Sequence, residues 1–293
     1  MSRYLHTLLK AIDLQVRSGL ANPEIKNLSC DSRDIEKGDL FLGLVGEKVD
    51  GGTYWKKAIE RGACAAIISK EASLLNPPTN EDPVVIVPDP VSLFMGKLAA
   101  DFWGKPSSET SLIGITGTNG KTTTSFLIEF LTTSLGHPSA LFGTLINRWP
   151  NHEETSKYTT TFAVPLQAQL RQAVQEGVEY VAMEVSSHAL SQNRVAGCDF
   201  SGAIFTNLSR DHLDYHDSME SYFEAKASLF RSHLIEDDGP RSVINIDDKW
   251  GAILAKELNK KCWTCSLKEN SQSRKKPDLY LSLIHISEPT RQR

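Results

Sequence analysis

Short apolar runs along this chain alternate with segments in which apolar residues return every three or four positions. The runs at residues 63–69 and 84–87 are bounded by polar or turn-forming residues, as is typical of buried strands. Residues 91–103 carry apolar side chains at helical spacing, which predicts an amphipathic helix. The alternation continues to about residue 267, and it predicts an α/β fold.

The first 108 residues are expected to form a small N-terminal α/β domain. Residues 104–109 are a loop-type linker of mainly small and turn-forming residues, and we place the domain boundary there. The pattern predicts helices over residues 4–16, 54–61 and 91–103, and strands over residues 39–45, 63–69 and 84–87.

Residues 109–280 are expected to form a second domain, a parallel sheet with helices on its faces. Ligands of such sheets bind at the carboxyl ends of the strands. The pattern predicts strands over residues 111–115, 139–145, 180–185, 202–206, 242–246 and 261–267, helices over residues 121–135, 165–176, 219–233 and 250–258, and an irregular stretch over residues 146–158.

The last residues differ in character from the rest. Residues 281–293 read LSLIHISEPTRQR, which resembles the translated read-through of a sequencing adapter. Our hypothesis is that this tail is not native and that native sequence stops near Tyr280, in the middle of the second domain.

Composition and charge argue against several classes of protein. A net charge of -4 provides no electrostatic footprint for nucleic acid, and no apolar run approaches the ~18 residues of a membrane span. The N-terminus lacks a secretory signal, and an odd number of cysteines, five, favours a reducing compartment. We therefore expect a cytoplasmic protein, with a monomer as the working expectation. Cys262 and Cys265 form a C-x-x-C without a second ligand pair, so a redox or zinc role is the weaker interpretation.

Residues 114–124, GITGTNGKTTT, form a glycine-rich loop between a predicted strand and a predicted helix. Gly117 and Gly120 let backbone N–H groups turn towards phosphate oxygens, Lys121 supplies a positive charge, and the Thr122 hydroxyl can reach a Mg²⁺ ion. Ile115 stands where the general phosphate-loop pattern has glycine, which indicates a variant loop. The alternative is a glycine and threonine turn without a ligand.

Two further predicted strands are followed by polar residues that could bind a ligand. Glu184 closes an apolar strand where a metal ligand facing bound ATP would lie, although an acidic residue at a solvated strand end would look the same. Residues 205–216, FTNLSRDHLDYH, follow another strand and are dense in histidine and aspartate, which favours a metal and phosphate site over a solvated turn. Spacing alone does not rank His212 above Asp214.

Lys226 shares the apolar face of the helix over residues 219–233 with Phe223 and Phe230. Loss of solvation there would lower its pKa and expose a neutral, nucleophilic amine. On periodicity alone, the alternative that its ammonium group extends to solvent stays open.

These motifs together, with Glu224-Ala-Lys226, resemble the Mur ligases of peptidoglycan synthesis, over about residues 30–267. The resemblance implies an ATP-dependent amide ligase that joins a diamino acid to UDP-MurNAc-L-Ala-D-Glu through an acyl phosphate. It places Thr122 and Glu184 on one Mg²⁺, His212 on a second, and a CO₂-derived carbamate on Lys226. The ATP-binding residues that it implies are Gly117, Thr118, Asn119, Gly120, Lys121, Thr122 and Thr123.

The resemblance also implies a site for the nucleotide sugar. In the first domain, residues 31–33, 38–41 and 46–51 are similar to the uridine-diphosphate-binding domain of that family. The implied substrate-binding residues are Cys30, Ser32, Glu47, Lys48, Val49, Tyr158, Thr159, Thr160, Ser186, Gln192 and Arg194.

Two related enzymes match less well. The ligase that adds D-Ala-D-Ala shares the first-domain pattern but differs at the strand end carrying Glu184. Folylpolyglutamate synthetases lack a first domain containing the Asp31-Ser-Arg33 pattern. A member of another class, a nucleotide-binding fragment without catalysis, stays open because the family's third domain, which selects the incoming amino acid, is missing from this sequence. We therefore expect weak ligand binding, no turnover and poor solubility, and the sequence leaves meso-diaminopimelate and L-lysine undistinguished.

Overall fold

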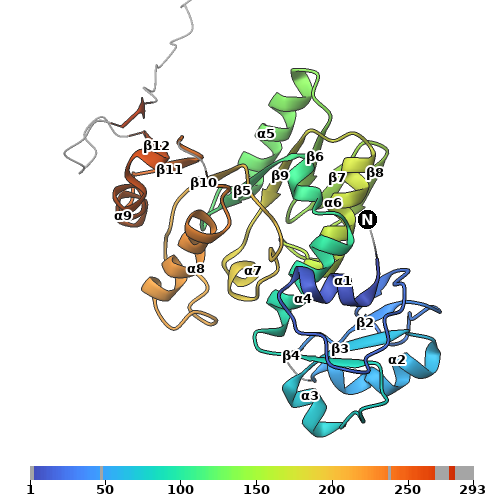
Figure 1. Ribbon diagram of the computed structural model, residues 1–293. Coiled ribbons are helices and arrows are strands. Elements are labelled where there is room, and N and C mark those ends of the chain that lie inside the picture. Colours follow the sequence, from blue (N-terminus) through green and yellow to red (C-terminus); the bar gives the residue numbers. More distant parts are fainter. Residues whose placement is uncertain (1–2, 47–48, 237–238, 268–276, 281–293) are drawn as a thin grey trace, which may run out of the picture.

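The computed structural model describes residues 3–46, 49–236, 239–267 and 277–280, which contain two separate sheets (Figure 1). The smaller sheet is fully parallel, with the strand order β1-β2-β3-β4. Its strands are Leu28–Ser29, Leu40–Leu42, Ala65–Ser69 and Val84–Val87. The associated helices are α1 (Leu5–Ala11), a 3-10 helix (Gly51–Tyr54), α2 (Trp55–Arg61), α3 (Lys70–Leu75) and α4 (Val91–Phe102).

The larger sheet has the strand order β13-β12-β11-β10-β5-β9-β6-β7-β8. It is parallel from β13 to β6, as the alternation of strands and helices predicts. Its strands are β5 (Ser111–Thr116), β6 (Ser139–Phe142), β7 (Ile146–Trp149), β8 (His152–Thr155), β9 (Tyr180–Glu184), β10 (Gly202–Phe205), β11 (Ser242–Asn245), β12 (Cys262–Ser266) and β13 (Leu279–Tyr280). Its helices are α5 (Lys121–Ser134), α6 (Ala163–Gln175), α7 (Ser187–Ser191), α8 (Met219–Ser232) and α9 (Lys249–Leu258), with a 3-10 helix at Asn259–Lys261. The prediction of an α/β fold with parallel sheets is confirmed.

The prediction of an irregular stretch at residues 146–158 was wrong over most of its length. Strands β7 and β8 form an antiparallel hairpin there, joined at Pro150–Asn151, and Asn151 adopts a φ of 63° in the turn. Half of the side chains of β7 are polar and those of β8 are polar throughout, so no apolar run marks this edge of the sheet. Helices α3 and α7 were also missed, because each is too short to show a helical repeat.

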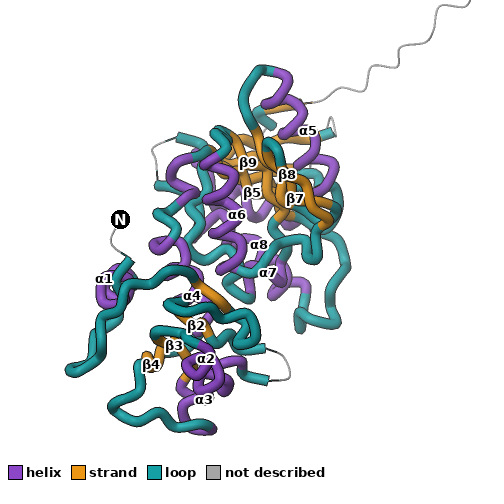
Figure 2. The backbone as a smooth tube through the Cα atoms, turned by 90° about the vertical axis from the view of Figure 1, so that its right-hand side faces the viewer, coloured by secondary structure: helices purple, strands orange, loops and turns teal. Residues whose placement is uncertain are grey.

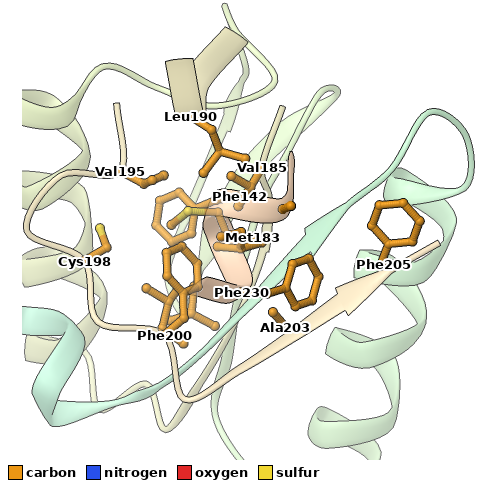
Figure 3. Packing of buried hydrophobic residues seen from close by; sticks show 14 of the residues in the cluster. Phe142, Met183, Val185, Leu190, Val195, Cys198, Phe200, Ala203, Phe205 and Phe230 are labelled. Atoms are coloured by element: carbon orange, nitrogen blue, oxygen red, sulfur yellow. The ribbon is translucent and has the colours of Figure 1, made fainter. Parts of the chain in front are cut away.

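The main core lies on the face of the larger sheet that α6, α8 and α9 cover. Buried aromatic and aliphatic side chains from the strands meet those of the helices there, including Met183 of β9 and Phe205 of β10 (Figure 3). Helix α5 packs on the other face, over Ile115 and Leu141. This packing fixes the strands whose carboxyl ends carry the site.

Helix α4 connects the two sheets. One side of α4 belongs to the core of the smaller sheet, while Gly96 lies so close to α6 that a Cβ atom there would be 3.0 Å from the Cβ atom of Ala163. Arg171 of α6 donates hydrogen bonds to the carbonyl groups of Trp103 and Gly104. The tube view in Figure 2 shows the smaller sheet below the larger one, with α4 between them. None of the described helices combines the length and apolar character of a membrane span.

Candidate phosphate-loop ligase site

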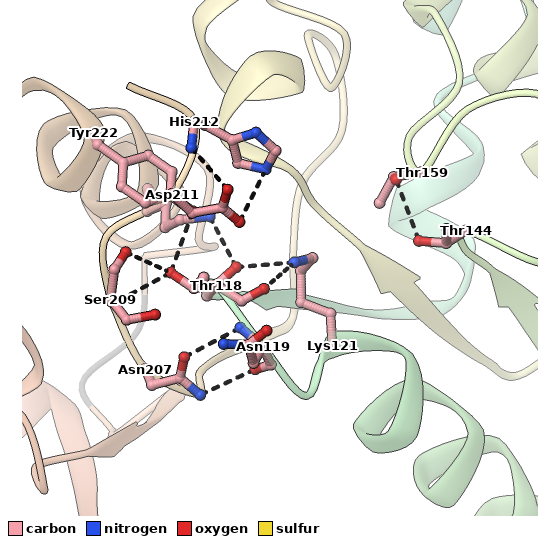
Figure 4. Close-up of polar contacts among 12 residues, drawn as sticks. Thr118, Asn119, Lys121, Thr144, Thr159, Asn207, Ser209, Asp211, His212 and Tyr222 are labelled. Atoms are coloured by element: carbon pink, nitrogen blue, oxygen red, sulfur yellow. Dashed lines mark hydrogen bonds and ion pairs between the residues drawn. The ribbon is translucent and has the colours of Figure 1, made fainter. Parts of the chain in front are cut away.

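The loop between β5 and α5 is held against the loop that follows β10. Gly117 has a φ of 144°, and a Cβ atom on it would lie 1.9 Å from the Thr206 hydroxyl, so only glycine fits without a shift. Thr118 N donates to the Asn207 carbonyl at 2.8 Å, and the Asn207 side chain exchanges hydrogen bonds with the backbone of Asn119. Figure 4 shows this pairing of the two loops. The loop after β10 therefore holds the glycine-rich loop in place.

The N-terminus of α5 faces outward at the end of this loop. Gly120, with a φ of 86°, precedes Lys121, the first residue of the helix. The first N–H groups of a helix have no acceptor within it, and the helix dipole favours anions at this end. Lys121 Nζ donates to the carbonyl groups of Gly117 (3.0 Å) and Thr118 (2.9 Å) and so lies across the loop. This arrangement fits the phosphate groups of a nucleotide.

Glu184 lies at the carboxyl end of β9, which is the neighbour of β5, and its side chain is fully buried. Its Oε2 atom accepts a hydrogen bond from the Thr122 hydroxyl at 3.0 Å. A buried carboxylate touching the phosphate-loop hydroxyl provides the oxygen donors that Mg²⁺ prefers, with phosphate oxygens and water completing the shell. The residues present therefore fit a Mg²⁺ ion bound together with a nucleotide.

Lys226 is 1% exposed, and its ammonium group does not extend to solvent. Its Nζ atom donates to the Gly117 carbonyl at 2.9 Å and lies 4.6 Å from the centre of the Tyr222 ring. Burial, with a smaller contribution from the charge of Lys121, lowers the pKa of Lys226 to about 7. The amine is thus substantially neutral near physiological pH, as the sequence pattern suggested.

His212 and His216 of the loop after β10 lie beside Tyr222 and beside His188 of α7. The ring centres of His188 and His212 are 5.1 Å apart, and those of His216 and Tyr222 are also 5.1 Å apart. His212 is exposed, has a φ of 51° and lies 3.6 Å from the Asp211 carboxylate. Burial, and secondly neighbouring positive charge, lowers the pKa of both His188 and His216. Neutral imidazoles are the form that binds metal, and burial favours this form in His188 and His216.

The residues expected to bind the substrate meet between β9 and the hairpin. Arg194 donates to the Thr160 carbonyl at 3.0 Å and to the Gln192 side chain at 2.7 and 2.9 Å. Its guanidinium group lies 5.2 Å from the centre of the Tyr158 ring. Ser186 N donates to the Thr160 hydroxyl at 3.1 Å. Segments distant in sequence thus form one surface beside Glu184.

A separate pocket lies on the smaller sheet, in a different part of the molecule. It is a pocket of about 460 Å³ that Cys30 and Ser32 line together with Lys57 and Arg61 of α2. Burial raises the pKa of the Cys30 thiol to about 12, so this cysteine stays a neutral thiol. The pocket has the size of a ligand site and carries positive charge.

Several predicted residues lie outside these groups. Val49 is exposed, and Glu47 and Lys48 lie outside the described residues, as does the tail 281–293. Cys262 and Cys265 lie on β12, and Cys262 packs in the main core. The described part of the chain contains no group of three or more His, Cys, Asp or Glu side chains arranged to hold a metal.

Sequence reasoning missed three residues of this site. Thr144 contacts Glu184 through its backbone N–H and through its hydroxyl. Asn207 holds the phosphate loop, and Tyr222 lies under the amine of Lys226. Asn207 lies within the polar run after β10 that the sequence did indicate, whereas Thr144 follows a strand without any chemical signature.

Comparison with known proteins agrees with this geometry. The family model described as "Mur ligase middle domain" matches residues 115–287, and "Mur ligase family, catalytic domain" matches residues 24–103. A UDP-N-acetylmuramoyl-L-alanyl-D-glutamate--2,6-diaminopimelate ligase of Prochlorococcus marinus (strain NATL1A) is 92% identical over 286 residues, which are 98% of this chain and 56% of the relative. An enzyme of the same name from Trichormus variabilis is 48% identical over 264 residues, 90% of this chain and 51% of the relative.

A solved structure of a UDP-N-acetylmuramoyl-L-alanyl-D-glutamate--2,6-diaminopimelate ligase has a TM-score of 0.77 and 31% identity, over 96% of this chain and 54% of that one. MurF from Acinetobacter baumannii, at 18% identity and a TM-score of 0.61 over 90% of this chain and 53% of that one, shares the fold. The chain spans about half the length of the relatives that it matches. The chain belongs to the Mur ligase family.

Proposed function

We propose that this chain belongs to an ATP-dependent ligase that joins 2,6-diaminopimelate to the D-glutamate of UDP-MurNAc-L-Ala-D-Glu in peptidoglycan synthesis. The observation that carries the proposal is the contact between Glu184 and the Thr122 hydroxyl, which sets a buried carboxylate against the phosphate loop. The names of the relatives supply the substrates, and they favour diaminopimelate over L-lysine. The proposal places a monomeric enzyme in the cytoplasm, in cell-wall synthesis that supports cell shape and division.

The two sheets would have different roles in ligand binding. Residues 1–108 would hold the UDP end of the nucleotide sugar in the pocket lined by Ser32 and Cys30. Residues 109–280 would bind ATP at the N-terminus of α5, with Lys121 on the phosphates. Arg194, beside Thr160, would attract the carboxylate end of the dipeptide.

In the first chemical step, an oxygen of the D-Glu γ-carboxylate forms a bond to the γ-phosphorus of ATP while the bond to the bridging oxygen breaks. The products are an acyl phosphate and ADP. The neutral amine of the diamino acid then forms the amide bond, phosphate leaves, and the amine proton passes to solvent. Lys121 and the first N–H groups of α5 would stabilise the charge that develops on the phosphoryl oxygens.

Two cation sites would support this chemistry. Thr122 and Glu184 would hold one Mg²⁺ and His212 a second. Mg²⁺, when bound, neutralises phosphate charge and orients the in-line transfer. The Lys226 amine would form a carbamate by attacking CO₂ with loss of a proton, and the carbamate oxygens would support the second cation. The carbamate would keep one N–H to donate to the Gly117 carbonyl, as the amine does at 2.9 Å.

A second candidate is a nucleotide-binding fragment that does not turn over, because the chain spans 56% of the relative that is 92% identical to it. The test therefore has two arms. In the first, calorimetry on this chain should detect binding of ADP with Mg²⁺, and Lys121→Met should weaken it. In the second, the chain extended to the length of its relatives should release phosphate from ATP only with UDP-MurNAc-L-Ala-D-Glu and a diamino acid, meso-diaminopimelate being preferred. Absence of ADP binding by the wild type would exclude both candidates.

A further inference from the structure

Thr144 occupies a position that no sequence motif marks. It follows β6, which pairs with β9 in parallel, so its backbone emerges at the same edge of the sheet as Glu184. The approach is close, because a Cβ atom on the preceding Gly143 would lie 2.3 Å from Glu184 Oε1. The missing side chain at Gly143 thus allows the carboxylate to lie directly against this turn.

Two groups of Thr144 hold the two oxygens of Glu184. The backbone N–H donates to Oε1 at 2.9 Å, and the hydroxyl donates to Oε2 at 3.0 Å. Thr122 donates to the same Oε2 atom at 3.0 Å. The carboxylate, which is the group we assign to the cation, is therefore fixed from one side by the phosphate loop and from the other by Thr144.

The same hydroxyl also contacts the segment expected to bind the substrate. The Thr144 hydroxyl donates to Thr159 Oγ1 at 3.2 Å. Figure 4 draws this contact between the two labelled residues. The Thr144 hydroxyl has a single proton, and both Thr159 Oγ1 and Glu184 Oε2 lie where they can accept it. The Thr144 hydroxyl therefore connects Thr159 with Glu184, and the two acceptors compete for the same proton.

The neighbouring residue makes a second connection. The Thr160 hydroxyl donates to the Glu184 backbone carbonyl at 2.8 Å, and Arg194 donates to the Thr160 carbonyl at 3.0 Å. A ligand that shifts residues 158–160 therefore acts on Glu184 both at its backbone and, through Thr144, at its carboxylate.

We propose that Thr144 is a positioning residue that orients Glu184 for the divalent cation and couples cation binding to occupation of residues 158–160 by the dipeptide substrate. The proposal rests on the proposed function, since that assigns the cation to Glu184. Coupling between two sites is reciprocal, so the substrate should tighten the cation as much as the cation tightens the substrate.

The test measures Mn²⁺ binding to this chain with ADP by electron paramagnetic resonance, with and without UDP-MurNAc-L-Ala-D-Glu. Thr144 is exposed, so Thr144→Val should leave the fold intact. A hydrogen bond to a charged group accounts for roughly a tenfold effect, and we expect Thr144→Val to weaken Mn²⁺ about tenfold and to abolish the coupling. Thr144→Ser should restore both. Thr155→Val changes an exposed threonine at the end of β8; it is the matched control and should change neither.

Wild-type affinity and coupling in Thr144→Val would overturn this role while leaving the proposed function in place. Failure of the wild type to bind Mn²⁺ with ADP would overturn both. A loss in Thr144→Val that Thr144→Ser does not restore would also count against it, because general disruption of the turn would then explain the loss.

Discussion

Lys121 and Lys226 donate hydrogen bonds to the same backbone oxygen, the Gly117 carbonyl, at 3.0 and 2.9 Å. One amine comes from the helix after the phosphate loop and the other from α8, more than a hundred residues later. Burial lowers the pKa of both, and in Lys226 the charge of Lys121 lowers it further. The pair therefore favours one ammonium ion and one neutral amine over two charges.

Replacing Lys226 should remove the carbamate and the ligase activity while leaving the protein folded. Lys226→Met keeps the length of the buried side chain without its charge, so the free energy of unfolding should fall little or rise. With ¹³C-labelled bicarbonate, wild-type protein should show a carbamate carbon signal in its NMR spectrum, and Lys226→Met should not. In the chain extended to the length of its relatives, Lys226→Ala should abolish ligation, with partial rescue by a short-chain carboxylic acid. Full activity of that variant would remove the carbamate role.

The stability of the protein should depend on pH through the same amine. The pKa of Lys226 is about 7 in the folded state and near 10.5 in the unfolded state. Between these values the unfolded chain binds more protons, so the free energy of unfolding rises with pH, by up to ~1.4 kcal/mol per pH unit. Below about pH 7 both states are protonated and the cost of the buried charge is fully present. Urea unfolding at pH 7 and pH 9 should show this rise in wild-type protein relative to Lys226→Met, and parallel profiles would contradict it.

The parts of the site that the sequence predicted are those with a strong chemical signature. A glycine-rich loop, a carboxylate ending an apolar run and a lysine on an apolar helix face each stand out along the chain, as Gly117, Glu184 and Lys226 did. Thr144 could not be found this way, because its role depends on β6 lying beside β9, which is a property of strand order. Tyr222 was missed for a similar reason, since it lies one helical turn before Lys226 and reads as an ordinary core residue.

The glycine at position 117 provides a test of the loop geometry. In Gly117→Ala the new methyl group would meet the Thr206 hydroxyl at 1.9 Å, with a φ of 144° that alanine rarely adopts. We expect a loss of about 2 kcal/mol or more in the free energy of unfolding and loss of ADP binding. Gly136→Ala is the matched control, because Gly136 lies just beyond the far end of α5 with a φ of 87° and no atom within 4 Å of the added Cβ. It should cost ~1 kcal/mol from strain alone and leave ADP affinity unchanged.

The pocket on the smaller sheet predicts a separate, electrostatic effect on nucleotide-sugar binding. Arg33 pairs with Asp31 at 2.6 Å, which neutralises one cation of the pocket. The Lys57 ammonium group, in contrast, lies 5.6 Å from the centre of the Tyr54 ring. Binding of the diphosphate group of a UDP ligand should therefore depend on Lys57.

We expect Lys57→Met to weaken UDP binding by a factor of about 5, an effect of about 1 kcal/mol, and to reduce its salt dependence. The adjacent Lys56→Met changes net charge equally, but Lys56 lies outside the lining of the pocket, so it should have little effect. Calorimetric titration of UDP at two salt concentrations distinguishes the two variants. Equal weakening by both would mean that overall charge, and not the position of Lys57 in the pocket, attracts the ligand.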